Sequence, residues 1–135
     1  MSEKYNEGTR NRPEGTRTLD APILRISLPD YIRQITNEVA WQDSDRNAIT
    51  VLHNEFQRIV LIALKQNAEM ARHAVDGAVI LQVLSGRLWV ESEAQSFSID
   101  EAEIAALRPG LAHTVFAEAE TICLLIMAGN HAGEF

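Results

Sequence analysis

From Ile49 onward the sequence consists of short β-prone runs separated by turns, and this pattern limits the fold more than any other feature. The runs are rich in Val, Ile, Leu, Thr and aromatic residues, which suit a pleated, half-buried backbone. They span residues 49–53, 56–64, 69–75, 78–84, 87–91, 95–99, 103–107, 112–116 and 121–127. Turn-prone pairs such as Asp76-Gly77 and Ser85-Gly86 separate them. Short strands at close and fairly even spacing predict an all-β sandwich or barrel.

The N-terminal part of the chain divides into a polar tail and a short helix. Residues 1–22 carry almost no large apolar side chains, so we expect them to form a disordered tail. Residues 28–40 predict a helix, because Pro29 suits a first turn and apolar residues recur at helical spacing through Val39. We therefore expect one domain over residues 23–135, in which a barrel over residues 47–128 follows the helix.

Composition places the chain in a broad class. A length of 135 residues is typical of one domain, and 46% hydrophobic residues suffice for a core without disulfides. The single cysteine, Cys123, fits a reducing cytoplasm. No signal peptide is recognisable, and no apolar run approaches the ~20 residues that cross a bilayer. The net charge of −7 disfavours binding to nucleic-acid phosphates. We therefore expect a cytoplasmic protein whose partners are neither nucleic acid nor membrane.

Two histidines carry most of the functional information. His73 lies in the run 69–75, shortly before Asp76-Gly77, and His113 lies in the run 112–116, shortly after Pro109-Gly110. This layout resembles the two signature motifs of the cupin superfamily, and the resemblance covers residues 50–128. Small single-domain bacterial cupins, most of them uncharacterised, share a single histidine before a Gly-containing loop. The resemblance implies a double-stranded β-helix, which is a jelly-roll barrel, with a short N-terminal helix.

The first cupin motif orders a glycine, two histidines, a glutamate and a second glycine. Counting back from Gly86, the glutamate position falls on Val79, the second histidine on Val75 and the first on His73. Asn67 occupies the first glycine position, and asparagine is the best replacement where a turn needs positive φ. The motif therefore keeps its turns and one histidine and loses two polar side chains.

The second cupin motif keeps its second glycine and its histidine, at Gly110 and His113. Ala102 stands where the motif has its first glycine, and Arg108 stands where it has proline. Ala117 stands where it has asparagine. Arg108 is either a side chain at the rim of the barrel or a partner for an anionic ligand.

The resemblance implies that His73, Val75, Val79 and His113 line the barrel interior, since alternate residues of a strand share a face. In cupins the corresponding side chains converge on a metal. Here His73 and His113 are the remaining candidate metal ligands, and two ligands make an incomplete set for a transition metal. The sequence leaves open a weakly bound divalent metal or no metal. It also leaves open whether Cys123 or His53 enters the pocket, and whether the two histidines are hydrogen-bonded remnants without function.

Three functions are compatible with these residues. The first is binding of a small molecule in the barrel pocket, with a degenerate metal site. The second is a metal-dependent cupin enzyme of dioxygenase or isomerase type, which needs a third protein ligand. The third is a non-catalytic regulatory or structural module. We also expect a homodimer, because outward-facing Ile80 and Leu84 would otherwise leave an apolar patch.

Overall fold

The computed structural model describes residues 4–6, 17–73 and 76–129. The two helices are α1 (Leu28–Asn37) and α2 (Val39–Asp43). The strands are β1 (Lys4–Asn6), β2 (Arg17–Asp20), β3 (Arg46–His53), β4 (Gln57–Leu64), β5 (Glu69–His73), β6 (Ala78–Ser85), β7 (Arg87–Ser92), β8 (Ser96–Asp100), β9 (Ile104–Leu107), β10 (His113–Ala117) and β11 (Thr121–Ala128). The all-β prediction is confirmed, because strands form most of the described chain.

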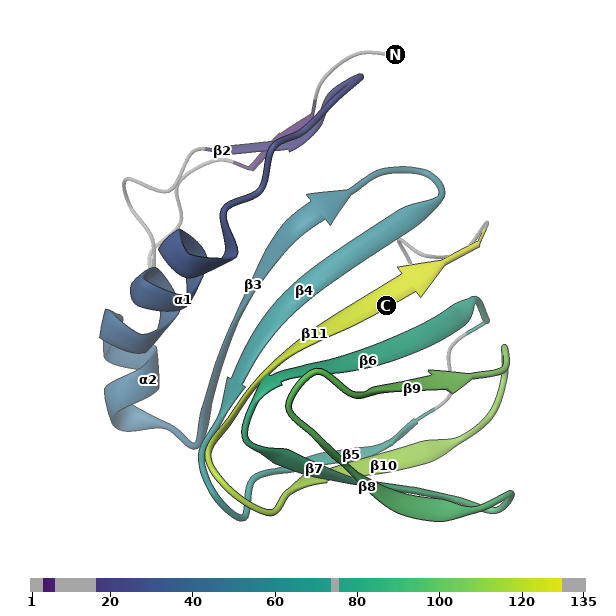
Figure 1. The fold of residues 1–135 in the computed structure, drawn as a ribbon. Helices are drawn as coiled ribbons and strands as arrows, with labels where there is room; N and C mark the ends of the chain where they lie inside the picture. The colour runs from purple at the N-terminus through teal and green to yellow at the C-terminus, as the bar shows by residue number, and fades with distance from the viewer. Residues whose placement is uncertain (1–3, 7–16, 74–75, 130–135) are drawn as a thin grey trace.

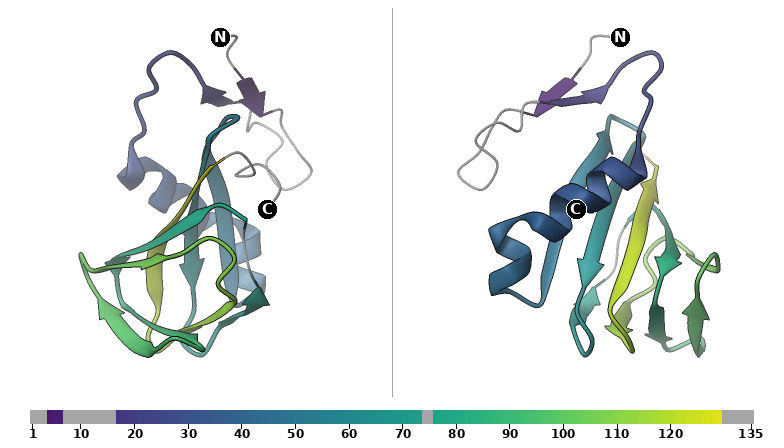
Figure 2. Two further views of the ribbon diagram at one scale, coloured as in Figure 1. Left: turned by 90° about the vertical axis from the view of Figure 1, so that its right-hand side faces the viewer. Right: turned by 60° about the vertical axis from the view of Figure 1, so that its left-hand side comes forward.

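Two antiparallel sheets face each other, and the helices cover the outer face of the larger one (Figures 1 and 2). The larger sheet has the order β3-β4-β11-β6-β9, and the smaller has the order β5-β10-β7-β8. From β4 to β11 the chain crosses from one sheet to the other at every connection except that between β7 and β8, and this is the connectivity of a jelly roll. The loop between β9 and β10 therefore crosses from the larger sheet to the smaller one.

The space between the sheets holds the main hydrophobic core. Along β6, every second side chain is buried, and Val79, Leu81 and Val83 form the inner face. Leu88 and Val90 of β7 face them from the smaller sheet, since side chains of a strand alternate between its faces. Among the described residues, the buried polar side chains are few and are those of Asp20, Asn47, His113 and Thr121. A polar side chain on the same inner face is therefore an exception.

A second core cluster lies under the helices. Ile35 of α1 is fully buried against Ile49 and Leu61, which are on the outer face of the larger sheet. Asn47 attaches the helix to β3, because its Nδ2 donates to the Ile35 carbonyl oxygen at 2.8 Å. Strand β4 is therefore apolar on both faces, which explains its unbroken run of hydrophobic residues. The helix ends at Asn37, earlier than predicted, and α2 begins at Val39.

The four glycine positions of the two motifs all have positive φ, although two of them are not glycine. The φ values are 75° at Asn67, 96° at Gly86, 67° at Ala102 and 80° at Gly110. The prediction that Asn67 adopts positive φ is confirmed. The backbone of the motif turns is thus retained where the glycine itself is not.

Residues 17–20 differ from the predicted tail. They form β2, in which Leu19 and Asp20 are buried. The Nδ2 atom of Asn54, in the β3–β4 turn, donates to Asp20 at 3.2 Å. This contact spans 34 residues, so local composition gave no sign of it. Residues 1–3 and 7–16 of the predicted tail lie outside the described residues.

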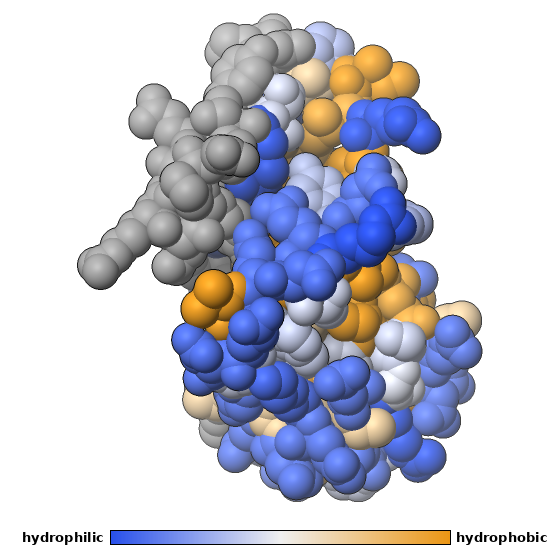
Figure 3. All heavy atoms as spheres, turned by 90° about the vertical axis from the view of Figure 1, so that its left-hand side faces the viewer, coloured by the Kyte–Doolittle hydropathy of each residue, from blue (hydrophilic) through white to orange (hydrophobic). Residues whose placement is uncertain are grey.

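The surface over the helices is polar across much of its area, with separate apolar areas between the charged groups (Figure 3). The large apolar side chains most exposed in the described chain are Ile23, Val39, Phe56, Trp89 and Ile104. In the part of the chain that the structure describes, neither helix has the length and hydrophobicity needed to cross a bilayer.

Candidate functional site

His113 is a buried polar side chain on the inner face of the smaller sheet. It begins β10, is 1% exposed, and shares its face with buried Val115 and Ala117. Its Nδ1 atom lies 3.0 Å from the Leu111 carbonyl oxygen. The turn before β10 therefore fixes the orientation of the ring.

The Leu111 contact also sets the tautomer of His113. A carbonyl oxygen only accepts hydrogen bonds, so Nδ1 is the ring nitrogen that carries the proton. In a neutral ring the other nitrogen, Nε2, is then a hydrogen-bond acceptor or a metal ligand. Nε2 is buried. The arrangement places a basic ring nitrogen among the apolar side chains of the inner face.

The backbone of His73 lies opposite that of His113. The two residues are register partners in the antiparallel pair of β5 and β10. Further along this pair, Val115 is the partner of Met70, so between these pairs one residue on β10 faces two on β5. Only the backbone of His73 is described, and Val75 lies outside the described residues.

The extra residue in β5 determines which face of the strand Glu69 occupies. Counting four residues back from His73 gives Glu69 the same face, but the bulge shifts the alternation by one. Met70 instead packs against the interior cluster, and Glu69 is exposed. Glu69 therefore does not supply a carboxylate to the inner face.

Val79 lies on the inner face of β6, at the end of the barrel where β10 begins. It is 2% exposed and pairs with Leu107 of β9 and Met127 of β11. Strand β9 ends at Leu107 and β10 begins at His113, and one loop joins the two strands (Figure 1). An apolar wall therefore occupies the position where the cupin motif has its glutamate.

The described donor set does not fit a tightly held transition metal. Such sites use three or four protein ligands. Among the described residues, no group of three or more His, Cys, Asp and Glu side chains is placed to hold a metal ion. The described side chains of the motif positions supply one imidazole, from His113, and the isopropyl group of Val79.

Cys123 enters the barrel interior but at a different level from Val79. It is fully buried and pairs with Val83, whereas Val79 pairs with Met127, which lies four residues further along β11. At about 3.3 Å per residue this is a separation of about 13 Å. Burial raises the pKa of the Cys123 thiol to about 12. Cys123 is therefore a small core residue and not a nucleophile.

Arg108 is exposed in the turn between β9 and β10, at the same end of the barrel as His113. This position agrees with a side chain at the rim.

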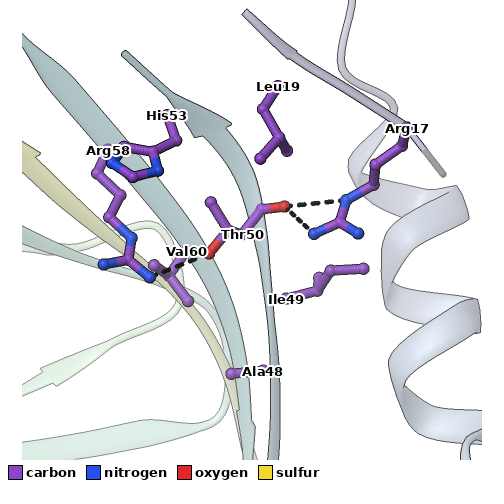
Figure 4. A pocket seen from close by; sticks show the side chains of 8 residues that line it. All are labelled: Arg17, Leu19, Ala48, Ile49, Thr50, His53, Arg58 and Val60. Atoms are coloured by element: carbon purple, nitrogen blue, oxygen red, sulfur yellow. Dashed lines mark hydrogen bonds between the residues drawn. The ribbon is translucent and has the colours of Figure 1, made fainter. Parts of the chain in front are cut away.

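His53 lies away from the barrel interior, in a cavity at the β3 edge of the larger sheet. This cavity is open and has a volume of about 380 Å³. Its lining comes from β2, β3 and β4 and consists of Arg17, Leu19, Ala48, Ile49, Thr50, His53, Arg58 and Val60 (Figure 4). Sequence reasoning missed this cavity because Arg17 and Leu19 fell within the predicted tail. The sequence did hold one signal of the cavity: Arg58 and Val60 are two residues apart, so they lie on the same face of β4.

Neither a family model nor a curated protein matches this sequence. Solved structures do match its fold. A cupin-2 domain containing protein from Shewanella frigidimarina has a TM-score of 0.61 at 15% identity, covering 77% of this chain and 94% of that one. KdgF from a Halomonas species has a TM-score of 0.60 at 15% identity, covering 67% of this chain and 84% of that one.

A longer protein matches as well. Salicylate 1,2-dioxygenase from Pseudaminobacter salicylatoxidans has a TM-score of 0.68 at 17% identity, covering 82% of this chain and 36% of the dioxygenase. Identities this low establish the fold alone. The resemblance inferred from the two motifs is confirmed at that level, and this chain adopts the cupin fold.

Proposed function

We propose that the barrel binds a small molecule at the end where β10 begins, with His113 as the polar contact. The observation that carries this proposal is the buried imidazole of His113 beside apolar side chains of the inner face. Ligand sites in proteins are commonly apolar cavities with a few convergent polar groups. The backbone register of His113 with His73 supports a second imidazole at the same level.

The chemistry of the residues indicates the kind of ligand. Nε2 of a neutral His113 accepts a hydrogen bond, so a ligand with a hydroxyl or N–H group suits it. Val79, Leu107 and Met127 supply apolar contacts. We therefore propose a small, mainly apolar molecule that donates one or two hydrogen bonds to the histidines.

The metal-dependent enzyme is the second candidate. The contact between Nδ1 of His113 and a backbone carbonyl favours it, because histidines that bind metals commonly have such a contact. The incomplete set of described ligands weighs against it. Metal content decides between the enzyme and the metal-free binding site. It is measured after purification without chelator, for the parent protein and for His73→Ala and His113→Ala. Near-stoichiometric metal that is lost in both variants would favour the enzyme.

Fragment binding followed by NMR tests the proposal itself. A library of neutral fragments bearing hydroxyl groups should shift the amide signals of His113 and Val79. The variant His113→Phe keeps the ring volume without the acceptor and should abolish these shifts. Thr114→Ala changes the neighbouring side chain, which points to the other face of β10, and should bind like the parent. Fragments that bind His113→Phe unchanged would refute the proposal.

The pH dependence of fragment binding gives a second test. Imidazoles ordinarily gain a proton near pH ~6.5, and an imidazolium donates from both nitrogens. A ligand that donates to Nε2 should therefore bind more weakly as the pH falls through this range. An affinity that does not change between pH 5 and 8 would contradict the assigned role of His113.

The homodimer stays a prediction. Ile80 and Leu84 are half-buried on the outer face of β6, and Ile104 of the neighbouring β9 is 56% exposed. Light scattering of the purified protein tests it, and a monomer at high concentration would contradict it.

A further inference from the structure

Strand β3 is a long edge strand with a composition that favours pairing with other strands. It lies at the end of the larger sheet, and among the described strands only β4 pairs with it. Residues 47–52 carry no charge and no proline, and they include the β-branched run Ile49-Thr50-Val51. Segments of this kind associate with a further strand when an edge leaves their backbone groups open. An uncovered β3 edge would therefore be a site of self-association.

Every second residue of β3 directs its backbone groups to the edge of the sheet. The Asp45 carbonyl oxygen, just before β3, accepts from the amide of Lys65, just after β4, at 2.8 Å. Hydrogen-bonded and open pairs alternate along an antiparallel ladder, so Arg46, Ala48 and Thr50 direct their backbone groups away from β4. These are the groups that a further strand would meet.

Side chains bind two of these backbone groups in the folded protein. The amide of Ala48 donates to Asn47 Oδ1 at 3.0 Å. The Thr50 carbonyl oxygen accepts from Nε and Nη2 of Arg17, at 3.2 and 2.7 Å (Figure 4). Asn47 belongs to β3 itself, whereas Arg17 comes from β2, 33 residues away in sequence. The contact with Arg17 therefore exists only while β2 lies beside β3.

Strand β2 covers the β3 edge without joining the larger sheet. Its ladder partner is β1, and the two form a separate sheet. Arg17 holds one end of β2 to Thr50, and Asp20 at the other end accepts from Asn54 Nδ2 at 3.2 Å. The open cavity of about 380 Å³ is lined by β2, β3 and β4, so the cover leaves space at the edge. Side chains, and not a backbone ladder, keep β2 in place.

We propose that Arg17 and β2 form a guard that keeps β3 from pairing with β3 of a second copy of this chain. The guanidinium of Arg17 occupies the Thr50 carbonyl oxygen and blocks the path of an incoming strand. A second copy suits an opened edge because two identical edges pair antiparallel about a two-fold axis. The absence of charge in residues 47–52 means that no repulsion would oppose this pairing. The guard does not depend on the function of the barrel site.

Light scattering of the full chain over a wide range of protein concentration tests the guard. Arg17→Ala removes the contact with Thr50 and should at least double the mean mass at high concentration, whatever the mass of the parent. Arg25→Ala removes an exposed arginine between β2 and α1 and should leave the mass unchanged. An Arg17→Ala variant with the mass of the parent at every concentration would overturn the proposal.

A second substitution shows whether the β3 edge is the surface involved. Ala48 is exposed on this strand, so Ala48→Lys adds a charge that paired edges would bring together. In the Arg17→Ala background it should restore the mass of the parent. Ala94→Lys adds the same charge in the exposed turn between β7 and β8 and should not restore it.

The double variants also separate edge pairing from loss of the fold. Association through a misfolded interior would not respond to one lysine on the β3 edge. A mass that stays raised in Arg17→Ala/Ala48→Lys would therefore overturn the proposal. A mass that falls equally in Arg17→Ala/Ala94→Lys would overturn it as well, because the added charge would then act without regard to the edge.

Discussion

Gly86 and Thr121 approach each other so closely that a side chain at the glycine position would collide with β11. A Cβ atom on Gly86 would lie 2.5 Å from Thr121 Oγ1 and 2.3 Å from the Glu120 carbonyl oxygen. The same hydroxyl accepts from the Arg87 amide at 3.0 Å and donates to the Ala119 carbonyl oxygen at 2.8 Å. The turn between β6 and β7 is thereby joined to the first residue of β11.

Gly86→Ala should therefore lower the free energy of unfolding by about 3 kcal/mol, since it adds a backbone clash to a left-handed φ of 96°. Gly110→Ala is the matched control. It has a φ of 80° with no atom within 4 Å of its Cβ position, so it should cost only about 1 kcal/mol. Urea denaturation measures both. Similar losses in the two variants would show that the contact with Thr121 does not matter.

Ala102→Gly should stabilise the protein. Ala102 has a φ of 67°, and an alanine in this left-handed region carries a penalty that glycine avoids. Allowing for the greater freedom of glycine in the unfolded chain, we expect a gain of about 0.5 kcal/mol. Ala106→Gly, within β9, should instead lose about 0.5–1 kcal/mol. Precise denaturation midpoints test the difference, and a loss at both positions would contradict it.

Asn47→Asp should destabilise the contact between α1 and the larger sheet. Nδ2 of Asn47 donates to the Ile35 carbonyl oxygen and to Glu38 Oε1, at 2.8 and 2.9 Å. A carboxylate of the same shape cannot donate and would repel Glu38. We expect a loss of about 2–3 kcal/mol, because buried hydrogen-bond groups would lose their partners. Thermal unfolding measures it, with Asn37→Asp at the exposed end of α1 as a control that should change little. An equal effect of both changes would contradict this role of Asn47.

Cys123 should be inert in the folded protein. Burial raises the pKa of its thiol from 9.0 to about 12, so the reactive thiolate is scarce at pH 8. Iodoacetamide should label the native protein far more slowly than the protein unfolded in urea. Rapid labelling of the native protein would show that the interior opens readily.

The same pKa shift makes stability fall at alkaline pH. The folded state holds the thiol proton more tightly, so its contribution is complete below pH 9 and is lost as the pH rises toward 12. Above pH 9, the parent should lose about 1.4 kcal/mol per pH unit relative to Cys123→Ala. Parallel stability curves for the two proteins would contradict this account.

Much of the fold was predictable because it depends on local signals. Short, almost continuously apolar runs such as 78–84 and 121–127 mark strands, and turn residues mark their ends. Asn67 illustrates the point, since its side chain type alone indicated the positive φ that the backbone adopts. These signals need only a few neighbouring residues, so they are readable without any long-range contact.

The candidate sites depended on contacts that no local pattern encodes. A single bulge in β5 turned Glu69 outward and Met70 inward, which residue counting could not anticipate. Arg17 reaches Thr50 across 33 residues of sequence, so a segment that reads as a polar tail completes a cavity. The sequence alone therefore established the barrel and the positions of its turns. Which side chains share a cavity was decided by strand register and long-range packing, because convergence of distant residues exists only in the folded chain.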